Sequence, residues 1–173
     1  MPENKKKKKY LPFYLLVIAA IIAADQGLKA WVHYSIPLNP LPEQTRPFLP
    51  GIVRLSHIHN SGAAFGMMQG MRIPFLILLA VFCAFVIWAL AKGHLSLPWE
   101  RWLAIIAVGG AISNGIDRAV HGYVEDMFEL VFMNFAIFNL ADFAINVSCI
   151  AFCLLILFGK DGKDKKEKTT AET

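Results

Sequence analysis

Four long, mainly apolar stretches are the feature that most constrains the fold of this chain, and they cover residues 11–34, 73–91, 102–120 and 138–158. Each has about the 20 residues that an α-helix needs to cross a bilayer core of about 30 Å. The composition agrees, because 56% of the 173 residues are hydrophobic and only 17% are charged. We therefore predict a single integral membrane domain, residues 1–173, that is mainly α-helical and has four transmembrane helices.

The first apolar stretch has a second interpretation. Five lysines at residues 5–9, followed by an apolar run, are also typical of the start of a cleaved secretory signal. However, the apolar pattern resumes after Asp25 and Gln26, and no separate soluble domain follows. We therefore expect the first helix to be retained.

The positions of lysine and arginine predict the orientation in the membrane. Of the 17 basic residues, five precede the first stretch, two lie in the 92–101 loop and five follow the fourth stretch. By the positive-inside rule, both termini and this loop face the cytoplasm. The tails 1–10 and 159–173 then act as topology signals in contact with lipid, and we expect no nucleic-acid partner. Segments 35–72 and 121–137 lie on the outer side.

Three predicted spans carry an acidic residue at one depth. Asp25 and Asp117 lie near the ends of the first and third spans, and Asp142 lies near the start of the fourth. With the predicted orientation, all three fall at the outer leaflet. A charge at the bilayer centre costs at least about 2.5 to 3.5 kcal/mol, so such acids face a bundle interior or a wet cavity and are functional candidates. Asp142 has no basic residue within a turn and most needs a chemical explanation.

Two of these acids also have structural interpretations. Asp25 and Lys29 are spaced i, i+4 on one helix face, where they can neutralise each other. Asp117 precedes Arg118 and follows Asn114 by about one turn, which indicates a hydrogen-bonded scaffold between neighbouring helices. For Asp117 we favour this scaffold over direct chemistry.

A partner for Asp142 is available in the outer segment that follows the third span. Residues 121–132, HGYVEDMFELVF, can form a short extended or amphipathic segment that returns to the membrane surface. Asp126 lies among apolar neighbours there, whereas we expect Glu125 and Glu129 to be solvated. If Asp126 and Asp142 face each other at a partly dry surface, they share one proton and can act as acid and base on a bound water.

The outer segment 35–72 contains a predicted strand. Residues 51–60, GIVRLSHIHN, alternate as a short strand does, and SGAAFG at 61–66 supplies small residues where a substrate approaches the backbone closely. His57 and His59 share one face of this strand and could bind a metal. There is no HExxH motif and no third ligand at a persuasive spacing, so we expect surface histidines and no metal.

Four ordered blocks resemble those of the lipoprotein signal peptidases, the bacterial signal peptidase II family. They are DQGLK (25–29), NSGAAFG (60–66), SNGIDRAVHGYVEDMF (113–128) and FNLADFAIN (138–146). The resemblance implies four transmembrane helices with a small extracytoplasmic β-rich cradle and a short surface helix. It implies an aspartic endopeptidase that cuts diacylglyceryl-modified prolipoproteins before the lipidated cysteine, with no cofactor.

The resemblance also assigns roles to individual residues. The catalytic dyad falls on Asp126 and Asp142. The supporting and substrate-binding positions are Asp25, Lys29, Asn60, Gly62, Asn114, Asp117, Arg118 and Asn139. The expected partners are the prolipoprotein substrates and membrane lipid, and we expect a monomer.

Two positions depart from the pattern of the family. Ser113 stands where the family usually has glycine before Asn114, and a residue as small as serine retains close packing. Glu125 stands where valine or isoleucine commonly precedes the dyad aspartate. If Glu125 turned inward, its carboxyl would raise the apparent pKa of the dyad.

Three other classes of function remain open from the residues alone. A serine and lysine hydrolase would use Lys29 with Ser56 or Ser61. A proton or cation pathway would use the acids of the spans, but the cytoplasmic halves of the spans are nearly uniformly apolar. A packing or chaperone role would need no dyad.

Overall fold

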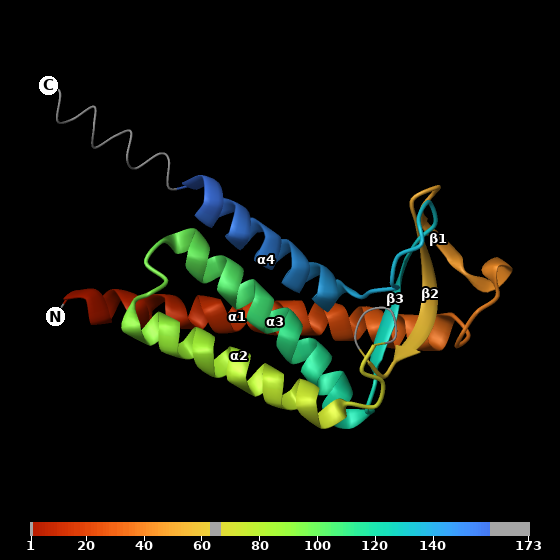
Figure 1. The fold of residues 1–173 in the computed structure, drawn as a ribbon, viewed down its shortest axis with the longest axis horizontal. Coiled ribbons are helices and arrows are strands. Elements are labelled where there is room, and N and C mark those ends of the chain that lie inside the picture. The colour runs from red at the N-terminus through yellow and green to blue at the C-terminus, as the bar shows by residue number, and fades with distance from the viewer. Residues whose placement is uncertain (1, 63–66, 160–173) are drawn as a thin grey trace, which may run out of the picture.

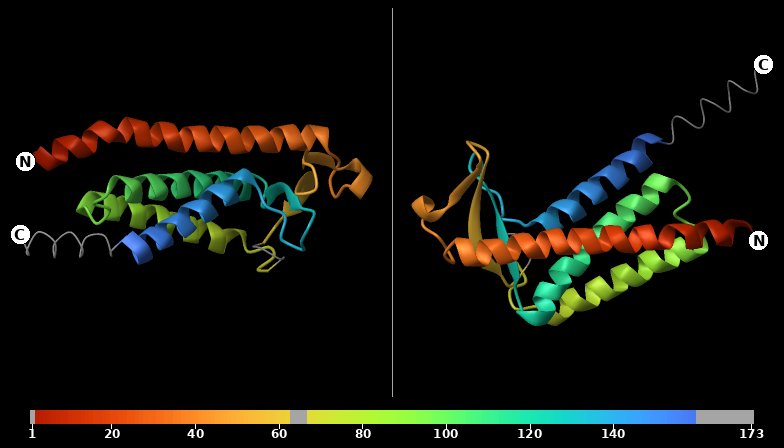
Figure 2. Two further views of the ribbon diagram at one scale, coloured as in Figure 1. Left: turned by 90° about the horizontal axis from the view of Figure 1, so that it is seen from above. Right: turned by 180° about the vertical axis from the view of Figure 1, so that it is seen from behind.

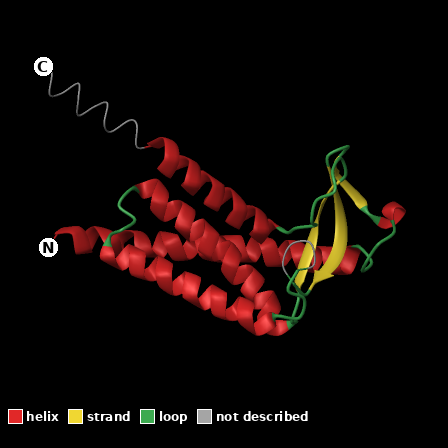
Figure 3. Ribbon diagram, viewed as in Figure 1, coloured by secondary structure: helices red, strands yellow, loops and turns green. Residues whose placement is uncertain are grey.

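The computed structural model describes residues 2–62 and 67–159, in which a helix bundle carries a small sheet at one end. The helices are α1 (Pro2–Ser35), α2 (Arg72–Lys92), α3 (Pro98–Val120) and α4 (Leu140–Gly159), and the strands are β1 (Arg46–Leu49), β2 (Val53–Asn60) and β3 (Val124–Leu130). A short 3-10 helix, η1 (Pro42–Gln44), precedes β1. Figure 3 shows the strands gathered at one end of the four helices, which confirms the predicted fold class.

All four helices are long and apolar enough to cross a membrane, over Tyr10–Ser35, Arg72–Lys92, Pro98–Val120 and Leu140–Phe158. The third begins before the predicted residue 102, because Pro98 occupies the first helical position and Glu100 accepts a 2.7 Å hydrogen bond from the Leu97 N–H. The ends of α1 and α4 that lie away from the sheet are at the same end of the bundle (Figure 1). Residues 63–66 and 160–173, which include most of the predicted substrate-approach segment and of the C-terminal tail, lie outside the described residues.

Helix α3 occupies the centre of the bundle and packs against α1, α2 and α4 (Figure 2). The close approach of α3 to α4 depends on Gly110. A Cβ atom at this position would lie 2.6 Å from the Ala141 carbonyl oxygen, where no side chain fits without a shift of the backbone. This contact brings the C-terminal half of α3 against the first turn of α4.

The three strands form an antiparallel sheet in the order β1-β2-β3. In the β2–β3 ladder, Ile58 lies opposite Asp126 and His59 lies opposite Glu125. The sheet packs on the C-terminal end of α1 through a small apolar cluster made of Val32, Ile36, Leu55 and Met127, with Leu28 and Phe128 beside it. Since successive side chains of a strand point to opposite faces, β3 presents Asp126 and Glu125 to different surroundings.

Candidate active site

Asp126 of β3 and Asp142 of α4 line the same pocket, which has a volume of about 260 Å³. The pocket lies where the sheet meets the adjoining ends of the helices. Its other polar lining residues are Asn60, Gly62, Arg118 and Asn146, and its apolar lining residues are Phe75, Val124, Phe135, Ala136, Ile137 and Phe138. The pocket therefore combines two carboxyl groups with a mostly apolar wall.

Asp126 is held by two asparagine side chains and is only 2% exposed. The Asn60 Nδ2 donates a 2.9 Å hydrogen bond to Asp126 Oδ2, and the Asn139 Nδ2 donates one of 2.7 Å to Asp126 Oδ1. Burial, together with the nearby negative charge of Asp142, raises the pKa of Asp126 to about 7, while the two asparagine hydrogen bonds act in the opposite direction. Near neutral pH, Asp126 is therefore divided between its protonated and ionised forms.

Asp142 is positioned by the first turn of α4. The Asp142 N–H donates a 2.8 Å hydrogen bond to Asn139 Oδ1, and the Asn139 N–H donates one of 3.3 Å to Asp142 Oδ2. This reciprocal pair is the arrangement of a capping box, which fixes the position of both residues at the helix start. The positive end of the helix dipole also favours a carboxylate there.

Asn139 and Asn114 connect the two carboxyl groups to the bundle. Asn139 is fully buried and contacts both Asp126 and Asp142. Asn114 Nδ2 donates a 2.7 Å hydrogen bond to Asp142 Oδ1, and its Oδ1 accepts hydrogen bonds of 3.1 Å from both Asn139 Nδ2 and Lys29 Nζ. The carboxyl pair is thus joined through amide side chains to a buried lysine on α1.

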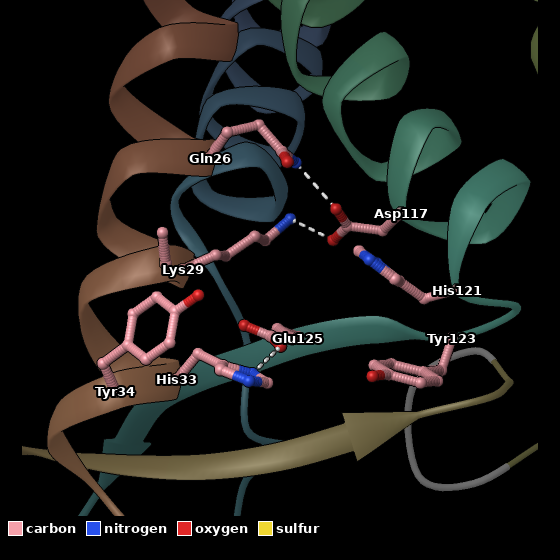
Figure 4. Close-up of a pocket in the computed structure, with 9 residues that line it drawn as sticks. Gln26, Lys29, His33, Tyr34, Asp117, His121, Tyr123 and Glu125 are labelled. Atoms are coloured by element: carbon pink, nitrogen blue, oxygen red, sulfur yellow. Dashed lines mark hydrogen bonds and ion pairs between the residues drawn. The ribbon is translucent and has the colours of Figure 1, made fainter.

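Lys29 makes three short polar contacts inside the bundle. Its Nζ lies 2.6 Å from Asp25 Oδ2 and 2.7 Å from Asp117 Oδ2, in addition to its contact with Asn114. Figure 4 shows the Lys29 and Asp117 side chains meeting between α1 and α3. Asp25 and Asp117 therefore neutralise Lys29 and join helices, which agrees with their structural interpretation from the sequence.

Two further polar residues belong to this network and were not singled out as site residues from the sequence. Gln26 Nε2 donates a 2.7 Å hydrogen bond to Asp117 Oδ1, and Ser113 Oγ donates one of 2.7 Å to Asp25 Oδ2. Asp25 Oδ1 also accepts a 2.9 Å hydrogen bond from the Ala141 N–H at the start of α4. The position of Gln26 beside Asp25 was the one local signal for its role, because a polar residue within an apolar span needs a partner.

Gly62 and Arg118 shape the remaining side of the pocket. Arg118 Nη2 donates a 3.0 Å hydrogen bond to the Gly62 carbonyl oxygen, and its guanidinium lies 4.4 Å from the centre of the Phe75 ring. Gly62 N–H donates a 3.0 Å hydrogen bond to Asn60 Oδ1, and a Cβ at Gly62 would collide with the Met67 carbonyl. These contacts hold the end of β2, and with it the Asn60 amide that faces Asp126.

Two sequence-based expectations about the outer segments are wrong. Glu125 is 7% exposed and His57 is 3% exposed, so neither is a solvated surface residue. The Glu125 side chain turns away from the carboxyl pair, and its Oε1 accepts a 2.8 Å hydrogen bond from His33 Nδ1. Its burial follows from its position on β3, where it faces the end of α1 and the neighbouring strand.

The serine and lysine alternative loses its geometric basis. Lys29 Nζ is occupied by Asp25, Asp117 and Asn114, and Ser61 Oγ donates a 2.9 Å hydrogen bond to Gln69 Oε1 instead. Ser56 is 3% exposed and lies outside the set of residues that line the carboxyl pocket. A pair of carboxyl groups is therefore the arrangement in this pocket that can perform acid and base chemistry on a water.

Two carboxyl groups share one pocket at one end of four candidate membrane spans, an arrangement suited to a membrane-embedded aspartic enzyme, and comparisons with known proteins identify the family. Residues 17–158 match the family model of signal peptidase II, Peptidase_A8. The chain is 36% identical over 163 residues to a lipoprotein signal peptidase of Enterococcus faecalis, covering 93% of this chain and 98% of the relative. It is 36% identical over 149 residues to one from Streptococcus pyogenes serotype M1, covering 86% and 93%.

Solved structures agree on the fold. One solved bacterial membrane enzyme matches this chain with a TM-score of 0.78 at 23% identity, and the match covers 91% of this chain and 94% of the solved chain. A second matches with a TM-score of 0.75 at 21% identity, covering 86% of this chain and 94% of the solved chain. The chain belongs to the lipoprotein signal peptidase family, signal peptidase II. It is an aspartic endopeptidase that cleaves signal peptides from prolipoproteins in a bacterial membrane.

Proposed function

We propose that Asp126 and Asp142 are the catalytic dyad, and that the scissile bond lies immediately before a cysteine that carries diacylglyceryl. The observation that carries this proposal is the meeting of the two carboxyl groups in one pocket, where Asn139 contacts both. Among the described residues that line this pocket, Asp126 and Asp142 are the two with carboxyl groups, which can act as an acid and a base of the same chemical type.

In the first step, Asp142 acts as the base and Asp126 carries the shared proton. Burial and the nearby Asp142 raise the pKa of Asp126 to about 7, so Asp126 can hold the shared proton near neutral pH, and Asp142 then accepts the proton from water. A water between the carboxyl groups gives a proton to Asp142 while the water oxygen attacks the scissile carbonyl carbon. Asp126 donates its proton to the carbonyl oxygen, which produces a neutral tetrahedral intermediate.

In the second step, the carbon–nitrogen bond breaks. Asp142 gives the proton taken from water to the departing amine nitrogen, and Asp126 recovers a proton from the intermediate as the carbonyl of the released signal peptide re-forms. The dyad returns to its starting state with one proton, so the reaction consumes one water and needs no cofactor. Asn60, Asn114 and Asn139 keep the two carboxyl groups in register throughout, because each donates to at least one of them.

The lining of the pocket supports a lipid-modified peptide as substrate. Phe75, Phe135 and Phe138 provide an apolar wall next to the dyad, whereas Asn60 and Asn146 provide amide groups for a peptide backbone. Each methylene group of an acyl chain that leaves water contributes about 0.8 kcal/mol. Binding energy from the acyl chains can therefore position the peptide bond at the carboxyl groups.

The proposed orientation places the dyad near the outer leaflet and both termini in the cytoplasm. It is supported by the basic residues at 5–9 and in the 92–101 loop, which lie at the end of the bundle away from the sheet. A monomer suffices for the proposed mechanism, since one chain supplies both carboxyl groups and their asparagine partners.

Cleavage of a synthetic prolipoprotein peptide tests the proposal. The purified chain in lipid is expected to cut a diacylglyceryl-modified peptide immediately before the modified cysteine, and to cut the unmodified peptide at least about tenfold more slowly, because the acyl chains supply binding energy. Product masses give the position of the cut. A well-folded protein that leaves the modified peptide intact, or cuts it elsewhere, would contradict the assignment.

The pH dependence of cleavage tests the assignment of the shared proton. Because the pKa of Asp126 is raised to about 7, the acid form is lost as the pH rises through this value, so we expect kcat/KM to fall on the alkaline side. The hydrogen bond from Asn60 lowers this pKa. Asn60→Leu should therefore move the alkaline limb to higher pH even if the maximum rate falls.

A neighbouring substitution provides the control for this pH profile. Ser61→Ala removes a hydroxyl whose contact is the exposed Gln69 side chain, so the limb should stay where it is in the wild type. The limb position is independent of how much active protein is present. An unchanged limb, or a shift to lower pH, in Asn60→Leu would show that Asp126 does not carry the proton.

A further inference from the structure

Three histidines and a glutamate gather on the side of the sheet that faces away from the dyad. They are His33 at the outer end of α1, His57 and His59 on β2, and Glu125 on β3. One ligand atom from each lies within 4.8 Å of all the others. The proposed peptidase mechanism uses none of these side chains.

The distances within this His33–His57–His59–Glu125 cluster approach those of a metal site. From Glu125 Oε1, His33 Nδ1 lies at 2.8 Å, His59 Nε2 at 3.8 Å and His57 Nε2 at 3.9 Å. A tetrahedral zinc ion bound at about 2.0 to 2.1 Å holds its ligand atoms about 3.3 Å apart. The three distances from Glu125 differ from this separation by roughly half an ångström, and the widest pair, at up to 4.8 Å, would have to close by roughly 1.5 Å. His33 would also have to release the Nδ1 proton that it donates to Glu125, because a metal ligand needs a free lone pair.

Two of the nitrogens are buried and unpaired. Within residues 2–62 and 67–159, neither His57 Nε2 nor His59 Nε2 has a hydrogen-bond partner. A buried polar atom without a partner has lost its hydrogen bonds to water and gained none in return, so its presence calls for an explanation. A bound cation would satisfy both nitrogens at once.

The tautomer of His57 suits a metal ligand. Its Nδ1 lies 2.9 Å from the carbonyl oxygen of Ile36, which can accept a hydrogen bond but cannot donate one. Nδ1 therefore carries the proton, and the lone pair of Nε2 points into the cluster. A backbone carbonyl that accepts a hydrogen bond from the other ring nitrogen and so orients the histidine is typical of metal-binding imidazoles.

His59 is also prepared for binding. Its ring stacks on Tyr123 with the ring centres 3.8 Å apart, which fixes its direction. A ring whose direction is already fixed loses less conformational freedom when it binds an ion.

The cluster is accessible, and the positive charge of the nearby lysine is more than offset by acidic groups. The His33 side chain is 47% exposed and lines, with Glu125, a pocket of about 250 Å³ (Figure 4). Lys29 also lines this pocket, but Asp25 and Asp117 neutralise its charge. An ion can therefore reach Glu125 from the solvent side past His33.

We propose that His33, His57, His59 and Glu125 bind one divalent transition-metal ion of the Zn²⁺ type. Four protein ligands make a closed site, which is the arrangement of structural zinc rather than catalytic zinc. The ion joins the outer end of α1 to β2 and β3. Because Glu125 precedes Asp126 on β3, the ion also holds the strand that carries the dyad.

Direct metal binding by the full chain tests this proposal. The protein is purified in detergent with a tag that lacks histidine, stripped with a chelator, and titrated with Zn²⁺ or with Co²⁺ as a spectroscopic probe. We expect one ion per chain, the visible absorption of tetrahedral Co²⁺, and a thermal unfolding midpoint about 5 to 10 °C higher when Zn²⁺ is present at 100 times its Kd.

Two ligand variants and one control locate the ion. His33→Ala and His59→Ala should each weaken Zn²⁺ binding by about 10²-fold or more, because loss of a ligand costs more than the 10 to 100-fold loss seen when a hydrogen-bond partner of a ligand is removed. His94→Ala should bind as the wild type does, since His94 lies against Trp88 at the other end of the bundle. His33 is half exposed, so its variant is expected to fold.

Either of two results would overturn the proposal. One is the absence of stoichiometric Zn²⁺ and Co²⁺ binding by the folded wild type. The other is equal affinity in the wild type and in His33→Ala, which would place the ion elsewhere. These measurements do not use peptidase activity, so the metal site and the catalytic dyad succeed or fail independently.

Discussion

Asp126→Asn and Asp142→Asn should each lower the rate of prolipoprotein cleavage by about 10²-fold or more, which is the loss expected when a general acid or base is removed. An amide at either position cannot take or give the proton that the proposed mechanism moves. The two amides retain nearly the same shape, so the Asn60, Asn114 and Asn139 contacts lose less than they would with alanine. Product formation by mass, with thermal unfolding of each variant, separates lost chemistry from lost folding.

Glu129→Gln is the matched control for the dyad variants. It replaces an acid on the same strand, but Glu129 pairs with Arg54 at 2.5 Å on a partly exposed surface. Such ion pairs contribute about 0 to 1 kcal/mol, so this variant should keep cleavage within about twofold of the wild type. Full activity in both dyad variants would return the serine and lysine or transport alternatives to consideration.

Lys29→Met should lower the free energy of unfolding by about 3 to 5 kcal/mol. The methionine fills a similar volume but leaves the carboxylates of Asp25 and Asp117 buried without a cation, and Asp25 is 0% exposed. The ammonium group also holds Asn114, which in turn donates to Asp142. The variant should therefore lose activity together with stability.

Denaturant or thermal unfolding in detergent measures this effect. Lys92→Met is the control, because Lys92 lies in the last turn of α2, outside the buried network. Its unfolding free energy should change by about 0.5 kcal/mol or less, as is usual for surface substitutions. If Lys29→Met and Lys92→Met had the same stability, the buried ion network would not hold the bundle together.

Local patterns were enough to predict much of the architecture. The apolar stretches correspond to helices, since a backbone in lipid must satisfy its own hydrogen bonds and about 20 apolar residues suffice to cross. The i, i+4 spacing of Asp25 and Lys29 was enough to predict their ion pair, because this spacing brings side chains together on any helix. The alternation in residues 51–60 likewise predicted β2.

Local sequence patterns predicted the candidate site only in part. Asp126 and Asp142 could be proposed as partners because the segment after the third span can return to the membrane surface near Asp142, and a family resemblance then assigned both to the dyad. Their bridging by Asn139 follows from the capping of α4 against β3. Gln26 was missed because its partner Asp117 lies on another helix, at a distance along the chain that no local periodicity covers.

The amino-acid sequence by itself determined the membrane spans, the surface strand and the identity of the residues able to carry the chemistry, because hydropathy and side-chain spacing act over a few turns. Only the tertiary structure decided which of those residues meet. Glu125 illustrates the difference, since its sequence neighbours predicted a solvated acid and the folded chain buries it beside His33 from α1 and His59 from β2. Contacts between distant elements depend on packing geometry, as at the glycine contact of α3 with α4, and no local pattern specifies that geometry.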